Sequence, residues 1–163
     1  MKLCRVGEPG LEKPAIIDKD NTIRDLSTII SDLNPKTLNF ETIDKINSIN
    51  INDLTEINPD LRMGPCVGNP SKFLGIGLNF KDHALEQNLP IPDEPIIFSK
   101  FTNCVCGPND DIEIPKGSEH TDWEVELGFV IGKKAKYISE NEALKYVLGC
   151  LLYTSPSPRD QLQ

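Results

Sequence analysis

The most regular hydrophobic pattern in the chain lies at residues 121–132, TDWEVELGFVIG. Successive side chains of a strand point to opposite faces, so this pattern predicts a strand with one apolar and one acidic face. The apolar face holds Trp123, Val125, Leu127 and Phe129, and the acidic face holds Asp122, Glu124 and Glu126. Carboxylates at i and i+2 lie roughly 6.5–7 Å apart. At an effective dielectric of about 20, their repulsion is on the order of 2 kcal/mol. The Glu124–Glu126 pair therefore either points into water or holds a cation such as Mg²⁺.

The first sixty residues have the pattern of a small α+β region. Three short strands are expected over 2–7, 14–17 and 22–26. The turn-forming residues 18–21 between the last two strands predict a β-hairpin.

Two helices are expected after this hairpin. The first covers 27–33 and ends before Asn34-Pro35, because a residue before proline avoids the helical region. The second has Asn39 as its N-cap, with its apolar residues on one face: Phe40, Ile43 and Ile46. The following stretch, 47–63, lacks periodicity, and three apolar side chains are expected to hold it against the core: Leu54, Ile57 and Leu61.

Glycine and proline crowd together at 63–70, which indicates a boundary after residue 64. Further strands are expected over 72–77, 96–100 and 112–115, before the acidic strand. A short helix capped by Asn79 or Asp82 is expected between the first two of these strands. The capping box Ser139-Glu140-Asn141-Glu142 predicts a helix over about 140–148 that ends at Gly149.

Composition narrows the possible partners. The 163 residues carry a net charge of −8, with a pI near 4.8, which argues against nucleic acid or an anionic membrane as the main partner. No apolar run approaches the roughly 18 residues of a membrane span, and Glu8-Pro9 interrupts any signal-peptide core, so a cytoplasmic protein is expected. Five cysteines, an odd number, favour free thiols. Cys104 and Cys106 stand too close together for a zinc knuckle.

Two further positions offer chemistry. His83 and Glu86 are neighbours on one helical face at i and i+3, and a carboxylate beside an imidazole gives the outline of a general-base pair. A simple surface pair is the alternative. Lys100 ends the apolar face of its strand and either extends along the surface or reaches into a site. Gly75 and Gly77 do not form a nucleotide site, because neither a third glycine at the required spacing nor a Lys-Ser/Thr pair follows.

Taken in order, these motifs resemble the fumarylacetoacetate hydrolase family. The resemblance runs from about Pro65 to Gly149 and rests on four segments: GLNFKDHALE at 77–86, PIIFSK at 95–100, GPND at 107–110 and DWEVELG at 122–128. It implies an α+β protein in which the N-terminal α+β region, 1–64, precedes the first half of a mixed β-roll at 65–150. Members of this family are similar in being Mg²⁺- or Mn²⁺-dependent enzymes of 2-oxo or dioxo acids, usually homodimers.

The resemblance also implies site roles, residue by residue. Glu124 and Glu126 match two metal-binding carboxylates, His83 matches the general base and Glu86 its orienting partner. The remaining matches concern the substrate: Lys100 near it, and Gly77 and Asn79 lining its pocket.

Two departures affect what the resemblance implies. Leu78 and Phe80 stand where many dicarbonyl hydrolases of the family have Arg and Tyr, which is more similar to hydratase and ureidoglycolate lyase members. The family's third metal carboxylate is expected near position 155, where this chain has Ser155.

The last residues, 151–163, lack strand alternation, and Pro156 and Pro158 argue against a strand there. This tail is interpreted as non-native sequence joined to the first half of a longer enzyme, with Asp160 not expected to replace the third ligand. The chain as written is expected to be poorly stable and inactive. An acidic α+β binding or scaffold module without catalysis is the alternative to the enzyme.

Overall fold

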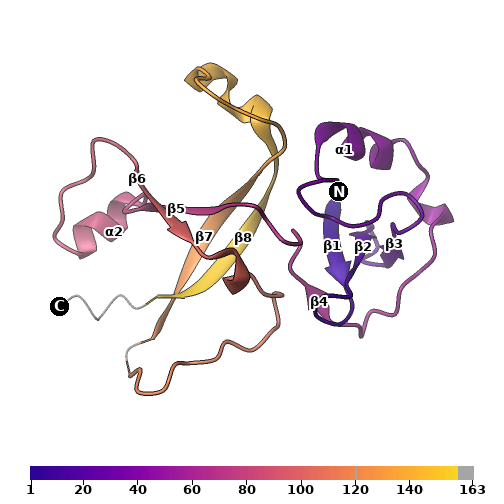
Figure 1. The fold of residues 1–163 in the computed structure, drawn as a ribbon, viewed down its shortest axis with the longest axis horizontal. Coiled ribbons are helices and arrows are strands. Elements are labelled where there is room, and N and C mark those ends of the chain that lie inside the picture. Colours follow the sequence, from indigo (N-terminus) through magenta and orange to yellow (C-terminus); the bar gives the residue numbers. More distant parts are fainter. Residues whose placement is uncertain (120, 158–163) are drawn as a thin grey trace.

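The computed structural model describes residues 1–119 and 121–157. Figure 1 shows two groups of elements, an N-terminal lobe and a later group that carries strands β5 to β8. We use "N-terminal lobe" for residues 1–64, which hold β1 to β4 and α1. The α+β class expected from the sequence is confirmed.

The N-terminal lobe is built on a four-stranded sheet in the order β3-β2-β1-β4. Its strands are β1 (Lys2–Val6), β2 (Lys13–Ile17), β3 (Ile23–Asp25) and β4 (Met63–Gly64). All neighbouring pairs are antiparallel. The expected hairpin is confirmed, and the carboxylate of Asp18 explains its turn, because it accepts hydrogen bonds from Asp20 N at 2.8 Å and Thr22 N at 2.9 Å.

Helix α1 (Phe40–Asn47) packs against this sheet through its buried residue Ile46. The expected N-cap is confirmed: Asn39 Oδ1 accepts a hydrogen bond from Thr42 N at 2.9 Å. The helix buries Ile46 in a core cluster shared with the sheet: Ile16, Leu26, Ile30, Leu33 and Ile46. A short 3-10 helix (Ile51–Asp53) follows, and Leu54 packs against the same cluster. Of the three anchors expected in 47–63, Leu61 is 46% exposed and does not serve as one.

Substitution of Asn39 tests how much its capping side chain contributes to the stability of α1. Asn39→Ala is expected to lower the free energy of unfolding by about 1 kcal/mol, because the amide of Thr42 loses its acceptor. Asn39→Asp keeps an acceptor and should stay close to the wild type. Urea unfolding followed by circular dichroism measures both variants, and equal losses for the two would contradict the capping role.

The helix expected over 27–33 is wrong. Residues 27–29 form a turn, in which Leu26 O accepts from both Ile29 N at 2.8 Å and Ile30 N at 3.0 Å. Downstream, Arg5 Nε donates to Asp32 Oδ1 at 2.7 Å. The buried positions Leu26, Ile30 and Leu33 imitate a helical spacing because they all face the core. Tertiary contacts, rather than a helix, therefore produce the pattern.

Strand β5 (Phe73–Gly77) pairs antiparallel with β6 (Ile96–Lys100), and α2 (Lys81–Glu86) lies in the connection between them. The N-cap of α2 is Phe80, with no side-chain cap, so the expected capping by Asn79 or Asp82 is wrong. Gly75 is needed for packing: a Cβ there would stand 2.4 Å from the ring of Phe98. A 3-10 helix (Thr102–Cys104) follows β6.

The acidic strand is confirmed as β7 (Asp122–Ile131), which pairs antiparallel with β8 (Val147–Ser157). The helix expected over 140–148 is a 3-10 helix, η3 (Glu140–Tyr146), without a side-chain cap from Ser139. It ends early because Tyr146 O accepts from Gly132 N at 2.9 Å, which starts the strand pairing. Gly149, expected to end the helix, lies in β8 opposite Val130.

Two further expectations about strands are wrong. Residues 112–115 form no strand, since no described segment pairs with them, and Ile112 and Ile114 are 51% and 60% exposed. By contrast, β8 continues through Pro156, which lies opposite Trp123. β8 has β7 as its one partner within the described residues, and proline is tolerated on such an edge strand. Pro158 and Asp160 lie outside the described residues.

The apolar side of β7 faces solvent. We call it the outer face; its exposed fractions are Trp123 71%, Val125 46%, Leu127 57%, Phe129 56% and Ile131 60%. Leu152 of β8, opposite Leu127, is 74% exposed. The acidic side of the same strand is turned toward α2 and is half-buried at Glu124 and Glu126.

All five cysteines are free thiols, as expected. Among the helices of the described residues, none combines the length and the apolar character that a membrane crossing requires.

Candidate active site

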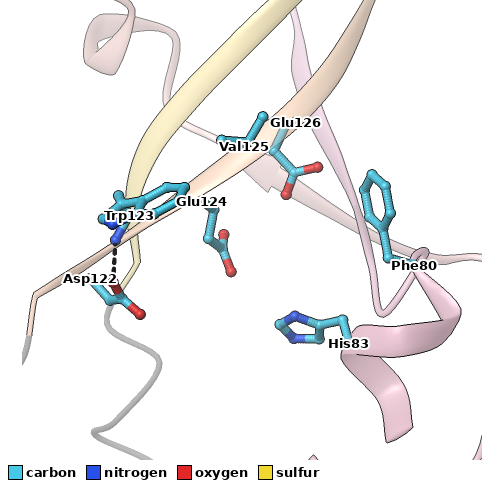
Figure 2. A pocket seen from close by; sticks show the side chains of 7 residues that line it. All are labelled: Phe80, His83, Asp122, Trp123, Glu124, Val125 and Glu126. Atoms are coloured by element: carbon cyan, nitrogen blue, oxygen red, sulfur yellow. Dashed lines mark hydrogen bonds between the residues drawn. The ribbon is translucent and has the colours of Figure 1, made fainter. Parts of the chain in front are cut away.

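An open cleft of about 350 Å³ lies between α2 and β7. Its lining comes from two segments about forty residues apart: Phe80 and His83 from the start of α2, and the run from Asp122 to Glu126 from β7. Figure 2 shows the carboxylates of Glu124 and Glu126 pointing into the space in front of the His83 ring.

The strand pairing sets the direction of the two carboxylates. Glu124 lies opposite position 155 of β8, and Glu126 lies opposite Tyr153. Directly paired residues of an antiparallel ladder share a face, so Tyr153 lies on the same face of the hairpin as Glu126. The position where the family resemblance leads us to expect a third carboxylate, 155, is the ladder partner of Glu124.

Helix α2 buries its side that carries Ala84, and this leaves His83 facing the cleft. Ala84 is fully buried, and its carbonyl accepts a hydrogen bond from Leu89 N at 2.9 Å. The neighbouring Asp82 is exposed and does not line the cleft. His83 is half-buried, so its ring is positioned by the helix and remains open to the cleft.

Four of the expected site residues do not line the cleft. Glu86, Gly77 and Asn79 are absent from its wall, and Glu86 and Asn79 are exposed. Lys100 packs instead against two aromatic rings: its Nζ lies 5.6 Å from the centroid of Phe73 and 5.1 Å from that of Tyr153. Tyr153 and Phe73 meet edge to face, with their centroids 5.2 Å apart.

Four residues that line the cleft had no site role expected from the sequence: Asp122, Phe80, Trp123 and Val125. Asp122 belongs to the same acidic alternation as the two glutamates, so that signal was present. Its carboxylate accepts a hydrogen bond from Trp123 N at 2.8 Å. Phe80 had a weaker signal, its position just before a short helix.

The cleft offers few donors for a hard divalent cation, but their type, carboxylate oxygen, suits one. Within residues 1–119 and 121–157, no three His, Cys, Asp or Glu side chains come together at metal-binding distance. Two carboxylates on one strand face are nevertheless sufficient for Mg²⁺, which usually keeps several waters and takes one or two protein carboxylates. The residues present therefore fit a weakly held Mg²⁺ or Mn²⁺.

Comparisons with known proteins agree with the family resemblance of the sequence motifs. The family model described as fumarylacetoacetate hydrolase, C-terminal, matches residues 72–163. A Burkholderia cenocepacia protein carrying the name "Putative hydrolase" is 48% identical over 160 residues, which are 98% of this chain and 57% of the relative. The chain thus spans little more than half the length of this curated relative.

Two solved structures have the same fold. A fumarylacetoacetate hydrolase from Exiguobacterium antarcticum matches with a TM-score of 0.78 at 20% identity, over 99% of this chain and 57% of that one. A 5-carboxymethyl-2-hydroxymuconate delta-isomerase from Mycobacterium smegmatis matches with a TM-score of 0.67 at 24% identity, over 99% and 56%.

Proposed function

The chain belongs to the fumarylacetoacetate hydrolase family, and on this premise we propose that it carries the general base and two metal carboxylates of a Mg²⁺- or Mn²⁺-dependent enzyme of 2-oxo or dioxo acids. The observation that carries the proposal is the convergence of His83 with Glu124 and Glu126 on one cleft. Alone, His83 or the two glutamates would be ordinary solvated surface groups, and it is their convergence that supports a base beside a cation site. A non-catalytic scaffold module would not require His83, Glu124 and Glu126 to line the same cleft.

Each residue then has a definite task. Glu124 and Glu126 would hold the cation, whose charge offsets their mutual repulsion and which, when bound, polarises the carbonyl of a 2-oxo acid. His83 would take a proton from water or from the carbon beside that carbonyl. Phe80, which also lines the cleft, would exclude water from the apolar end of the substrate.

The other roles implied by the family remain proposals. Lys100 would stabilise developing negative charge, which requires its Nζ to turn away from the Phe73 and Tyr153 rings. Glu86 would orient His83 from the neighbouring turn of α2, and Gly77 and Asn79 would contact the far end of the substrate. A homodimer is likewise expected from the family.

The names of the two similar structures favour small organic acids as substrates. One is named as a hydrolase of fumarylacetoacetate and the other as an isomerase of 5-carboxymethyl-2-hydroxymuconate. Bond hydrolysis, hydration and isomerisation all begin with polarisation of an oxo group and movement of a proton beside it. The proposal therefore extends to the 2-oxo or dioxo acid class.

A substitution at position 155 tests the proposal, because this position pairs directly with Glu124 in the β7–β8 ladder. Ser155→Asp is expected to tighten Mn²⁺ binding by roughly tenfold or more, since cation affinity in oxygen sites rises with the number of charged ligands. Free Mn²⁺, followed by electron paramagnetic resonance during titration, gives the affinity.

Thr154→Asp is the matched control. It adds the same charge to the neighbouring position of β8, opposite Val125 on the outer face. An equal gain for both variants would mean that general charge, rather than a site, attracts the cation. No gain for Ser155→Asp would contradict the proposed metal site.

A further inference from the structure

We propose that the N-terminal lobe is a positioning frame for the cleft, which fastens the His83 segment through Arg62 and the Glu124–Glu126 segment through Phe40. The inference rests on the proposed function only in giving the cleft its purpose; the two fastenings are contacts of the described residues. Arg62 and Phe40 are positioning residues, because neither lines the cleft.

The first fastening joins Arg62 to the loop that follows β6. Arg62 Nε donates to Asp110 Oδ1 at 2.7 Å, and its Nη2 donates to Asp110 Oδ2 at 2.5 Å. Such a two-point contact fixes orientation as well as distance. Gly107 N also donates to Asp110 Oδ2, at 2.6 Å, so the turn at 107–110 is closed by the same carboxylate. The Arg62 guanidinium lowers the pKa of Asp110, which keeps this carboxylate charged.

Arg62 is itself held by the lobe. Its Nη1 donates to Gly7 O at 3.1 Å and to Glu12 Oε1 at 3.1 Å. Glu12 in turn pairs with Arg5 at 3.3 Å, and Arg5 with Asp32 at 2.7 Å. The side chains of Arg5 and Glu12 are only 7% and 5% exposed. A chain of alternating charges therefore leads from the core of the lobe to the loop.

Close packing confirms that the loop is seated there. A Cβ on Gly107 would stand 2.2 Å from Met63 O, so only glycine permits this approach. Met63 begins β4, and eight residues separate Gly64 from the start of β5; six separate the end of β6 from Gly107. Both ends of the β5–α2–β6 unit, which carries His83, are thus joined to this part of the lobe by short linkers.

The second fastening lies just beyond the end of β7. Lys133 Nζ is 5.6 Å from the Phe40 ring centroid and 4.3 Å from that of Tyr146. A Cβ on Gly132 would come within 3.1 Å of the Phe40 ring, which shows how closely the end of β7 approaches α1. Phe40 begins α1, whose Ile46 is buried in the core of the lobe.

The two walls of the cleft are therefore tied to one rigid body at separate places. His83 comes with the unit held at Asp110, and Glu124 and Glu126 come with the strand held at Gly132. Since α1 and β4 belong to the same lobe, its packed core sets how these two walls face each other. Removal of either tie should loosen its own wall and leave the lobe intact.

Hydrogen–deuterium exchange on the whole chain tests the Arg62 tie without needing metal or substrate. Arg62→Met is expected to raise exchange of residues 101–119 and of α2 by roughly fivefold, the loss of a charge-assisted pair, with β1, β2 and α1 unchanged. Asp110→Asn should do the same, and the double variant should be no worse than either single variant. Arg62→Lys keeps the charge but not the two-point contact and should be intermediate.

Arg24→Met is the matched control. Arg24 donates to Asp18 at 2.8 Å and contacts Glu56 at 3.3 Å, both within the lobe. This variant should leave exchange of 101–119 unchanged. The inference is overturned if Arg62→Met does not raise exchange there, if Arg24→Met raises it equally, or if the two tie variants add independently.

The Phe40 tie has its own variant pair. Phe40→Ala should raise exchange of 130–136, whereas Phe40→Tyr keeps the ring and should restore protection. The Mn²⁺ titration described for Ser155→Asp, repeated with the Arg62→Met change, separates the two proposals. Loosened walls with no Mn²⁺ binding in any variant would overturn the metal site and leave the frame standing.

Discussion

Glu124→Gln together with Glu126→Gln, introduced into the Ser155→Asp chain, is expected to weaken Mn²⁺ binding by at least roughly a hundredfold. The physical reason is charge: the double change removes the carboxylates of Glu124 and Glu126 from the cleft while keeping side-chain size. An amide oxygen remains a ligand but does not balance the charge of the cation. Titration with Mn²⁺ detected by electron paramagnetic resonance measures the loss.

The matched control for this experiment is a pair of glutamates away from the cleft. Glu140→Gln with Glu142→Gln removes the same charge from η3, where Glu142 pairs with Lys145 at 2.8 Å. This control should leave Mn²⁺ affinity within about twofold, because exposed charges beyond a Debye length are largely screened. Equal losses in both double variants would reduce the metal site to a general effect of the negative net charge and favour the scaffold alternative.

His83→Gln is expected to slow proton removal from a 2-oxo acid by roughly 10²- to 10⁴-fold, the usual contribution of a positioned general base. The change keeps a polar side chain of similar reach in the cleft and removes the basic nitrogen. We would measure deuterium exchange at C3 of 2-oxobutyrate by NMR, with Mg²⁺ present. The chain would be continued with the C-terminal part of the Burkholderia cenocepacia relative, since this chain covers 57% of that protein.

Asp82→Asn is the control for His83, because Asp82 is the preceding residue of α2, is exposed and does not line the cleft. The Asp82→Asn variant should catalyse deuterium exchange at C3 of 2-oxobutyrate at the wild-type rate. A small effect of His83→Gln, comparable with that of Asp82→Asn, would remove His83 from the mechanism. Retained Mn²⁺ binding in the His83 variant would show that the metal and base roles are separate.

The sequence was informative where one local pattern controlled the structure. The alternation around Glu124 and Glu126 predicted β7 and the shared direction of the two carboxylates, because a strand leaves no other choice. Asn39 predicted the start of α1, because its side chain bonds an amide three residues later. Both signals depend only on neighbouring residues.

Sequence reasoning failed where distant residues decided the outcome. The apolar spacing in 27–33 came from core packing of Leu26 and Leu33, and a turn satisfied it as well as a helix would. Lys100 ends the expected strand, yet its direction depends on Phe73 and Tyr153, which are brought beside it only by folding. The convergence of His83 with Glu124 was implied by family resemblance, since no spacing along the chain reveals it.

The outer face of β7 has a consequence for how the protein behaves at high concentration. Two aromatic residues, Trp123 and Phe129, and several aliphatic side chains are exposed along this one face of β7. Within the described residues, the other edge of β8 has no partner strand, so its backbone groups are unpaired there. Apolar patches above a few hundred Å² are rare on monomers, and free strand edges are templates for pairing. Any contact that covers the outer face of the β7–β8 hairpin therefore competes with association between two copies of the hairpin. We therefore expect the uncovered outer face and the free β8 edge to make the chain self-associate as its concentration rises.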